Sequence, residues 1–225
     1  EYTTSQNFDR MAYASINAIT VVPGAIGAFR KKAIEDAGGF NTDTLAEDCD
    51  LTMGILEKDY VIENENAATA MTEAPESLRQ FVKQRTRWTF GVMQTFWKHR
   101  AALFSKKHKG FGLWAMPNML IFQYIIPTFS PLADLMMLFG LFMGNGWQIF
   151  IYYLLFLLVD GSVSIMAYIV EKEPLWVLLW IIPQRFFYRW VMYYVIFKSY
   201  MKAIKGELQS WGVLKRTGNV TIANK

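Results

Sequence analysis

The sequence is poor in residues that hold disulfides or metal ions. Its 225 residues include one cysteine, Cys49, and two histidines, His99 and His108. A single cysteine excludes an internal disulfide and any metal site built from several thiolates. Neither histidine has a second ligand at the spacing of a metal site, so we expect no protein-held metal among these residues. The neutral interpretation of Cys49 is a small apolar side chain on a buried helix face.

Charge is absent from two long stretches of the second half. No Asp, Glu, Lys or Arg occurs at 110–133 or 135–159, which gives runs of 24 and 25 residues. A bilayer core about 30 Å thick needs roughly 20 apolar residues as helix, so both runs predict membrane spans. A large soluble core is the alternative, but it rarely contains two such runs in succession. The sequence predicts a multi-pass protein of the cell (inner or plasma) membrane.

The net charge of +4 is unevenly placed. Basic residues at 106–109 precede the first apolar run, and five more follow the last one: Lys198, Lys202, Lys205, Lys215 and Arg216. Lys and Arg beside membrane helices usually mark the cytoplasmic side and contact anionic headgroups. The lipid bilayer is therefore the expected partner of these basic residues. Nucleic acid, the competing interpretation, does not fit the membrane context.

The first half, residues 1–110, alternates between predicted strands and helices, which is typical of an α/β layered fold. The predicted strands lie within 18–30 and at 60–66, and the predicted helices cover 31–37, 44–58 and 77–104. Gly38 and Gly39 end the first of these helices. Thr44 and Glu47 have the spacing of a capping box, which predicts the start of the second.

The second half is predicted as an α-helical transmembrane region at 111–200, followed by a basic tail at 201–225. Pro127 and Pro131 divide the first apolar run, because proline breaks helices. We expect an interface helix followed by about three spans, the last with a break near Pro183. These segments are 112–126, 128–144, 147–170 and 175–200. Three spans would leave the basic tail outside, so either 111–143 crosses twice or one stretch is re-entrant.

Two adjacent carboxylates stand at the start of the predicted helix 44–58. A carboxylate can take a proton from a hydroxyl group, which makes Asp48 a candidate general base. First-turn N–H groups and the helix dipole favour a charged carboxylate at this position. Glu47 would serve as the cap and support Asp48. The alternative is an acidic first turn whose charge only complements the helix dipole. Asp50 is assigned no role.

A second motif, Q-x-x-R-W, lies on the predicted helix 77–104. Gln84, Arg87 and Trp88 have i, i+3, i+4 spacing and therefore share one face. Arg87 offers a planar fork of donors suited to a diphosphate, Gln84 can add a hydrogen bond, and Trp88 offers a face for a pyranose ring. Arg85 points elsewhere, toward the helix surface or lipid headgroups. The alternative is an amphipathic helix on the membrane with Trp88 as its anchor.

The loop at 23–27, sequence PGAIG, contains two glycines that allow a backbone to approach a ligand closely. Gly24 and Gly27 are candidates for such an approach, and an ordinary turn is the alternative. In the apolar half the notable charges are Asp134, Asp160, Arg185 and Arg189. Ionisable groups at membrane depth usually face a partner or a water-filled path. The arginines could line a channel, pair with Asp160 or lie at the interface.

Together, Ala46-Glu47-Asp48 and Q-x-x-R-W, 36 residues apart and followed by membrane segments, resemble the processive family-2 glycosyltransferases, which make cellulose, chitin, hyaluronan and poly-β-1,6-N-acetylglucosamine. VVPGAIGAFRKKAI and AGGFNTDTLAEDCDL are most similar to the poly-N-acetylglucosamine branch. The motif resemblance covers about 17–110. It implies Asp48 as the catalytic base, Gln84 and Arg87 at the nucleotide diphosphate, and Trp88 at the acceptor. Ala46 replaces the threonine that is usual there. The resemblance also implies that the loop with Gly24 and Gly27 lines the acceptor site.

The resemblance further implies the C-terminal half of a GT-A-type domain that uses Mg²⁺ or Mn²⁺, held by the donor diphosphate and an upstream Asp-x-Asp. Because the chain does not begin with Met, we expect that residue 1 is not a natural start and that the upstream half is missing. Without that half, the fragment is expected to be inactive alone. The expected enzyme is an inverting, membrane-embedded synthase that extends an exopolysaccharide of biofilm or envelope type from a UDP-sugar, most simply UDP-N-acetylglucosamine. Alternatives are a non-processive transferase acting on a lipid-linked acceptor and a non-catalytic export subunit. An accessory export subunit is a possible partner.

Overall fold

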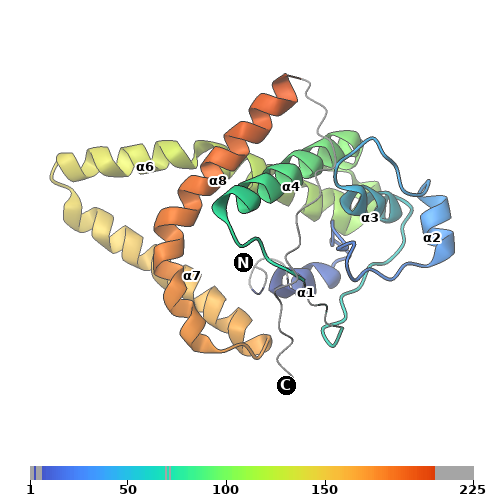
Figure 1. Ribbon diagram of the computed structural model, residues 1–225, viewed down its shortest axis with the longest axis horizontal. Helices are drawn as coiled ribbons and strands as arrows, with labels where there is room; N and C mark the ends of the chain where they lie inside the picture. Colours follow the sequence, from blue (N-terminus) through green and yellow to red (C-terminus); the bar gives the residue numbers. More distant parts are fainter. Residues whose placement is uncertain (1–2, 4–6, 69, 71, 206–225) are drawn as a thin grey trace. The chain divides into compact units, whose positions relative to one another are not determined.

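The computed structural model describes residues 3, 7–68, 70 and 72–205. These residues divide into two compact units. The first unit comprises Glu1–Ile19, Val61–Asn64 and Leu103–Tyr194, and the second comprises Thr20–Tyr60, Glu65–Ala102 and Val195–Lys225. Figure 1 labels α1–α4 and α6–α8, and its colours follow the chain from the N-terminus to the C-terminus.

The second unit is built on two packed helices, α3 (Glu47–Glu57) and α4 (Leu78–Lys98). A short helix, α2 (Lys31–Asp36), packs against α3, and a 3₁₀ turn, η2 (Arg100–Ala102), follows α4. Eight consecutive residues of α3, from Cys49 to Leu56, are buried. An α-helix buried on every side requires cover on every side, so α3 is the centre of this unit.

The helix ends of the second unit partly follow the predictions. Gly38 and Gly39 have φ values of 89° and 77°, and their N–H groups donate to the Glu35 and Ile34 carbonyls at 3.1 and 2.8 Å, which ends α2 as predicted. The capping box is wrong, because α3 begins at Glu47 behind Ala46, which makes no side-chain cap. Among the described residues, the buried Thr44 hydroxyl has no hydrogen-bond partner.

No strand occurs among the described residues, so the α/β class is not confirmed. Residues 18–30 and 60–66, predicted as strands, are extended loops and turns. A strand needs a neighbouring backbone to complete its hydrogen bonds. Here side chains take that place: the Val22 N–H donates to Thr52 Oγ1 at 3.0 Å, and the Ile62 N–H donates to Asn17 Oδ1 at 2.9 Å.

The first unit contains a short helix, α1 (Asp9–Ala14), and a long helical run from 111 to 142. The run consists of η4 (Phe111–Ala115), α5 (Met116–Asn118), η5 (Met119–Ile125) and α6 (Ile126–Phe142), and η3 (Lys106–His108) precedes it. It is followed by α7 (Gly146–Val170), η6 (Leu175–Trp180) and α8 (Ile181–Ile204). Residues 195–204 of α8 belong to the second unit.

The predicted break at Pro127 does not occur, and 112–126 and 128–142 form one helical run. Two π-helical segments, η4 and η5, end two residues before Pro117 and Pro127, respectively. Proline removes the N–H that would bond to the carbonyl four residues earlier and clashes with that carbonyl. A π turn widens the helix at this point and absorbs the mismatch, so the chain continues without a break.

Two helices of the described part are long and apolar enough to cross a membrane, Phe111–Phe142 and Gly146–Val170. Only 6% of the most apolar window of each is buried within the protein. Phe142 and Trp147, near the turn between them, are 86% and 70% exposed. The expected third span, 175–200, consists of η6 and α8, and α8 begins two residues before Pro183. That proline therefore lies in the first turn, where its missing N–H costs no hydrogen bond.

Candidate functional site

Asp48 lies at the second position of α3 and accepts hydrogen bonds from backbone amides. Its Oδ1 accepts from the Cys49 N–H at 2.8 Å, and its Oδ2 accepts from the Gly24 N–H at 3.4 Å. The side chain is half-buried. These two backbone N–H groups hold the Asp48 carboxylate in place at the start of α3. The predicted first-turn position of Asp48 is therefore confirmed, although the cap is not.

The loop at 23–27 lies against the start of α3, and its two glycines differ. A Cβ at Gly24 would meet no atom within 4 Å, so the backbone is open beside the Asp48 carboxylate. A Cβ at Gly27 would lie 2.6 Å from the Phe29 ring and 3.0 Å from Val22. Packing within the loop thus explains Gly27. Of the two glycines, Gly24 is the one that the structure brings to Asp48.

The two sequence motifs meet where α3 begins. A Cβ at Gly91 of α4 would lie 2.9 Å from both the Cβ and the backbone nitrogen of Ala46. Gly91 follows Arg87 by four residues and Gln84 by seven, so all three lie on one face of α4. The start of α3 therefore packs on the face of α4 that carries the Q-x-x-R-W residues. This close approach requires a residue without a side chain at Gly91.

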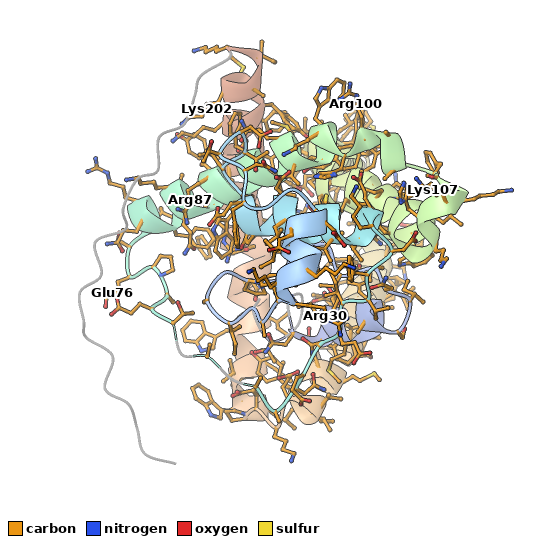
Figure 2. The ribbon with its side chains drawn as sticks, turned by 90° about the vertical axis from the view of Figure 1, so that its right-hand side faces the viewer. Arg30, Glu76, Arg87, Arg100, Lys107 and Lys202 are labelled. Carbon is orange, nitrogen blue, oxygen red and sulfur yellow. The ribbon has the colours of Figure 1, made fainter. Side chains whose placement is uncertain are left out.

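Glu47 and Arg87 interact across this junction. Burial raises the pKa of Glu47, and the Asp48 charge raises it further, whereas its backbone hydrogen bond and the Arg87 guanidinium lower it. Arg87 is half-buried on α4, and Figure 2 labels it there. The junction thus contains two carboxylates and a guanidinium, which suits a site where a proton is removed beside a phosphate.

Gln84 is buried, with 7% of its surface exposed, and its Oε1 has no hydrogen-bond partner among the described residues. Buried polar atoms are normally paired, so this oxygen has unused hydrogen-bonding capacity. The prediction for Arg85 is wrong: the residue is buried rather than on the surface. Its guanidinium lies over the rings of Phe81 and Trp88, 5.2 and 4.6 Å from their centroids. Trp88 is half-buried, and Arg85 stacks on its ring.

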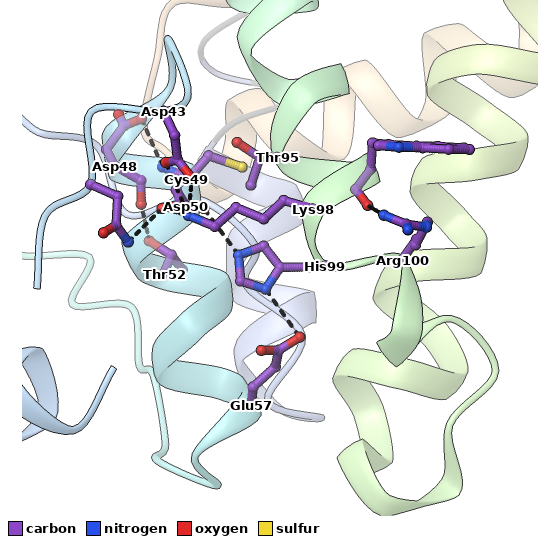
Figure 3. A network of polar contacts seen from close by, with 12 residues as sticks. Asp43, Asp48, Cys49, Asp50, Thr52, Glu57, Thr95, Lys98, His99 and Arg100 are labelled. Carbon is purple, nitrogen blue, oxygen red and sulfur yellow. Dashed lines mark hydrogen bonds and ion pairs between the residues drawn. The ribbon is translucent and has the colours of Figure 1, made fainter. Parts of the chain in front are cut away.

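A buried polar cluster that the sequence interpretation missed joins α3 to the end of α4 (Figure 3). Asp50, 3% exposed, is within 3.1 Å of His99 Nε2 and accepts from Lys98 Nζ at 2.8 Å. The other ring nitrogen, His99 Nδ1, lies 3.0 Å from Glu57 Oε1. Asp50 and Glu57 are seven residues apart and therefore share one helix face, the one available signal of this cluster.

The cluster fixes the charge of its members. Burial lowers the pKa of His99, but the hydrogen bonds and charges of Asp50 and Glu57 outweigh it and raise the pKa to about 9. Burial raises the pKa of Asp50, and the hydrogen bonds from His99, Lys98 and Asn41 overcome this and lower it to about 2. At neutral pH the cluster therefore contains an imidazolium between two carboxylates.

A metal ion does not fit these residues. The described part of the chain contains no group of three or more His, Cys, Asp or Glu side chains placed to hold a metal ion. Asp48 and Asp50 are two residues apart, about 200° around a helix, and so cannot chelate one ion. Burial raises the pKa of the Cys49 thiol, and this fully buried group is not available as a thiolate ligand.

Among the charges of the apolar half, Arg189 pairs with Asp134 and not with Asp160. The guanidinium of Arg189 in α8 forms an ion pair with the Asp134 carboxylate in α6 and donates through Nε at 3.1 Å. The Tyr193 hydroxyl donates to the same carboxylate at 3.0 Å. The ion pair joins two helices of the first unit. The side chain of Arg185 lies outside the described residues.

The family model for glycosyl transferase family group 2 matches residues 1–200. The chain belongs to this family. Among curated relatives, it is 35% identical over 91 residues to a probable glycosyltransferase, YdaM, of Bacillus subtilis (strain 168), a match that covers 40% of this chain and 22% of the relative. No solved structure was found to match the chain.

Two other relatives are named as polysaccharide synthases. Identity is 29% over 101 residues to a poly-β-1,6-N-acetyl-D-glucosamine synthase of Staphylococcus epidermidis, covering 43% of this chain and 24% of the relative. It is 33% over 116 residues to the UDP-forming cellulose synthase 1 catalytic subunit of Komagataeibacter xylinus, covering 50% of this chain and 16% of the relative. The matched segment thus spans a quarter or less of each of these relatives.

Proposed function

We propose that the chain is part of an inverting, processive glycosyltransferase that extends a β-linked exopolysaccharide from a UDP-sugar. The observation that carries this proposal is the meeting of the two motifs at one point. The start of α3 lies between two pairs of groups: Asp48 with the Gly24 amide on one side, and Glu47 with Arg87 on the other. Each residue type suits one part of a sugar transfer, and family membership gives the reaction class.

The proposed reaction begins with the acceptor hydroxyl hydrogen-bonded to the Asp48 carboxylate. Asp48 takes the hydroxyl proton while the oxygen attacks C1 of the donor sugar. The bond from C1 to the diphosphate oxygen breaks on the opposite face, its electron pair leaves with UDP, and the configuration at C1 inverts. Arg87 binds the growing negative charge on the diphosphate, and the free Gln84 oxygen accepts a hydrogen bond from the nucleotide.

Trp88 is proposed as the platform for the acceptor sugar. It is half-buried, and the Arg85 guanidinium stacks on its ring. The donor proposed is UDP-N-acetylglucosamine, supported by the name of the staphylococcal relative, whereas the Komagataeibacter relative is named for cellulose and UDP. A divalent cation would come with the donor diphosphate, since the described residues do not hold one.

Membrane insertion is proposed for the apolar helices. The exposed apolar side chains of α6 and α7 would be unstable in water, because little of either helix is covered by this chain. We propose residues 1–110 as cytoplasmic, 111–200 as the membrane region and 201–225 as a basic tail. Residues 18–30 and 60–66 would join a sheet with strands from outside this chain, since the relatives are several times longer than the matched segment.

The test uses membranes from cells that express the complete gene product containing these residues. Membranes receive labelled UDP-N-acetylglucosamine or UDP-glucose with Mg²⁺, and the products are separated by size. We expect label in a high-mass polymer from the first donor, and none with the variant Asp48→Asn. Polymer from UDP-glucose alone would correct the sugar, short lipid-linked products would favour a non-processive transferase, and no transfer from any donor would reject an enzymatic role.

A further inference from the structure

We propose that His99 is a positioning residue for sugar transfer: held between Asp50 and Glu57, it fixes the rotation of α3 and thereby the direction of Asp48. This inference rests on the proposed function, because it assigns a task in the same reaction. It concerns a histidine that touches neither motif.

His99 contacts α3 at two points. It lies one residue beyond the end of α4, and its two ring nitrogens reach Asp50 and Glu57 at 3.1 and 3.0 Å (Figure 3). These carboxylates are seven residues, or about 10 Å, apart along α3. A rigid ring that binds α3 at two points one above the other prevents the helix from turning about its axis.

The two contacts of His99 with α3 determine the direction of Asp48. Asp48 and Asp50 are separated by about 200° around the helix axis, so they point in nearly opposite directions. When His99 and Lys98 hold Asp50 on the α4 side, Asp48 is turned away from them, toward the Gly24 amide. A rotation of α3 by a few tens of degrees would move the Asp48 carboxylate by an ångström or more from any fixed acceptor.

Charged and polar groups from α3, α4 and the preceding loop surround His99. Besides Asp50 and Glu57 from α3, the neighbouring groups are Lys98 on α4, which also pairs with Asp43 at 3.0 Å, and Asn41, which donates to Asp50 at 3.3 Å. The His99 ring is 8% exposed. A neutral ring can donate from only one nitrogen, so loss of its proton breaks one of the two contacts. To keep both contacts with α3, His99 must therefore be protonated, as the imidazolium.

The experiment measures kcat and the KM for the donor between pH 6 and 10, in membranes carrying the complete protein. With His99→Gln, we expect kcat at pH 7.5 to fall on the order of 10²-fold, the usual effect of a misplacement near 1 Å, with little change in KM. His99→Arg keeps a positive charge at every pH. It should restore most of kcat and extend activity to higher pH than in the wild type.

Three comparisons decide the inference. The matched control is His108→Gln, which changes the other histidine and should leave both kcat and the pH profile as in the wild type. Thermal unfolding of each variant gives the folded fraction, to which kcat is normalised. If the wild type is active and His99→Gln retains kcat, or His99→Arg keeps the wild-type alkaline limb, the positioning role is wrong. If the wild type transfers no sugar from any donor, the proposed function itself fails.

Discussion

Replacement of Gly91 by alanine tests the packing on which the site depends. The new Cβ would lie 2.9 Å from the Ala46 backbone nitrogen and 3.1 Å from the Leu45 carbonyl carbon, distances that real Cβ atoms rarely show. Because two of these neighbours are backbone atoms, no side-chain rotation relieves the clash. The start of α3 must move away from α4, and Asp48 moves with it.

The matched control is Gly54→Ala, in the middle of α3. A Cβ there would lie 3.5 Å from Ala37, an ordinary contact. Both substitutions gain about 1 kcal/mol of helix propensity, which cancels in the comparison and leaves the overpacking cost of about 1–3 kcal/mol at Gly91. We expect Gly91→Ala to be less stable than Gly54→Ala by this amount.

The assay combines thermal unfolding of the purified protein in detergent with polymer synthesis in membranes. A domain of this size shifts its Tm by roughly 2–4 °C for each kcal/mol, so the two variants should differ by several degrees. Gly54→Ala should retain activity, and Gly91→Ala should lose it beyond its loss of folded protein. Equal Tm and equal kcat for the two variants would refute the contact between Ala46 and Gly91.

Two further predictions concern charge. The pKa of His99, about 9, lies above its ordinary value of 6.5. Protonation of His99 therefore stabilises the folded protein by about 3 kcal/mol; this stabilisation is complete below pH 6.5 and is lost as the pH rises through 9. Thermal unfolding from pH 5 to 10 should show that decline, and His99→Arg should remove it. Asp134→Ala should cost up to about 3–5 kcal/mol by leaving Arg189 without its carboxylate, and the added change Arg189→Met should recover most of it, as measured by unfolding in detergent. If the stability of the wild type does not decline with pH, the His99 assignment is contradicted. If the double variant recovers no stability, the assignment of the Asp134–Arg189 pair is contradicted.

The sequence predicts the local features of the site better than its fold. The shared face of Gln84, Arg87 and Trp88 follows from helix periodicity, which depends only on neighbouring residues. Asp48 lies in the first turn of α3 as predicted, although the capping box that predicted this position does not form. The strands predicted at 18–30 and 60–66 are not confirmed in the described residues, because strand formation depends on a partner backbone that local sequence does not reveal.

Three other differences have separate physical causes. Arg85 was assigned to the surface, yet it is buried and stacks on two rings of its own helix. Asp50 was given no role, since its partners Lys98 and His99 lie 48 and 49 residues away in sequence. The helix break expected at Pro127 is absent because π turns accommodate proline, an outcome that hydropathy and proline positions alone do not predict.

The central claim is that Asp48 removes the acceptor proton while Arg87 binds the diphosphate. The most direct measurement compares UDP binding and sugar transfer for Asp48→Asn and Arg87→Ala in the complete protein. We expect Asp48→Asn to bind UDP like the wild type and to transfer no sugar, and Arg87→Ala to bind UDP more weakly. Transfer by Asp48→Asn at a rate near the wild type would contradict the account.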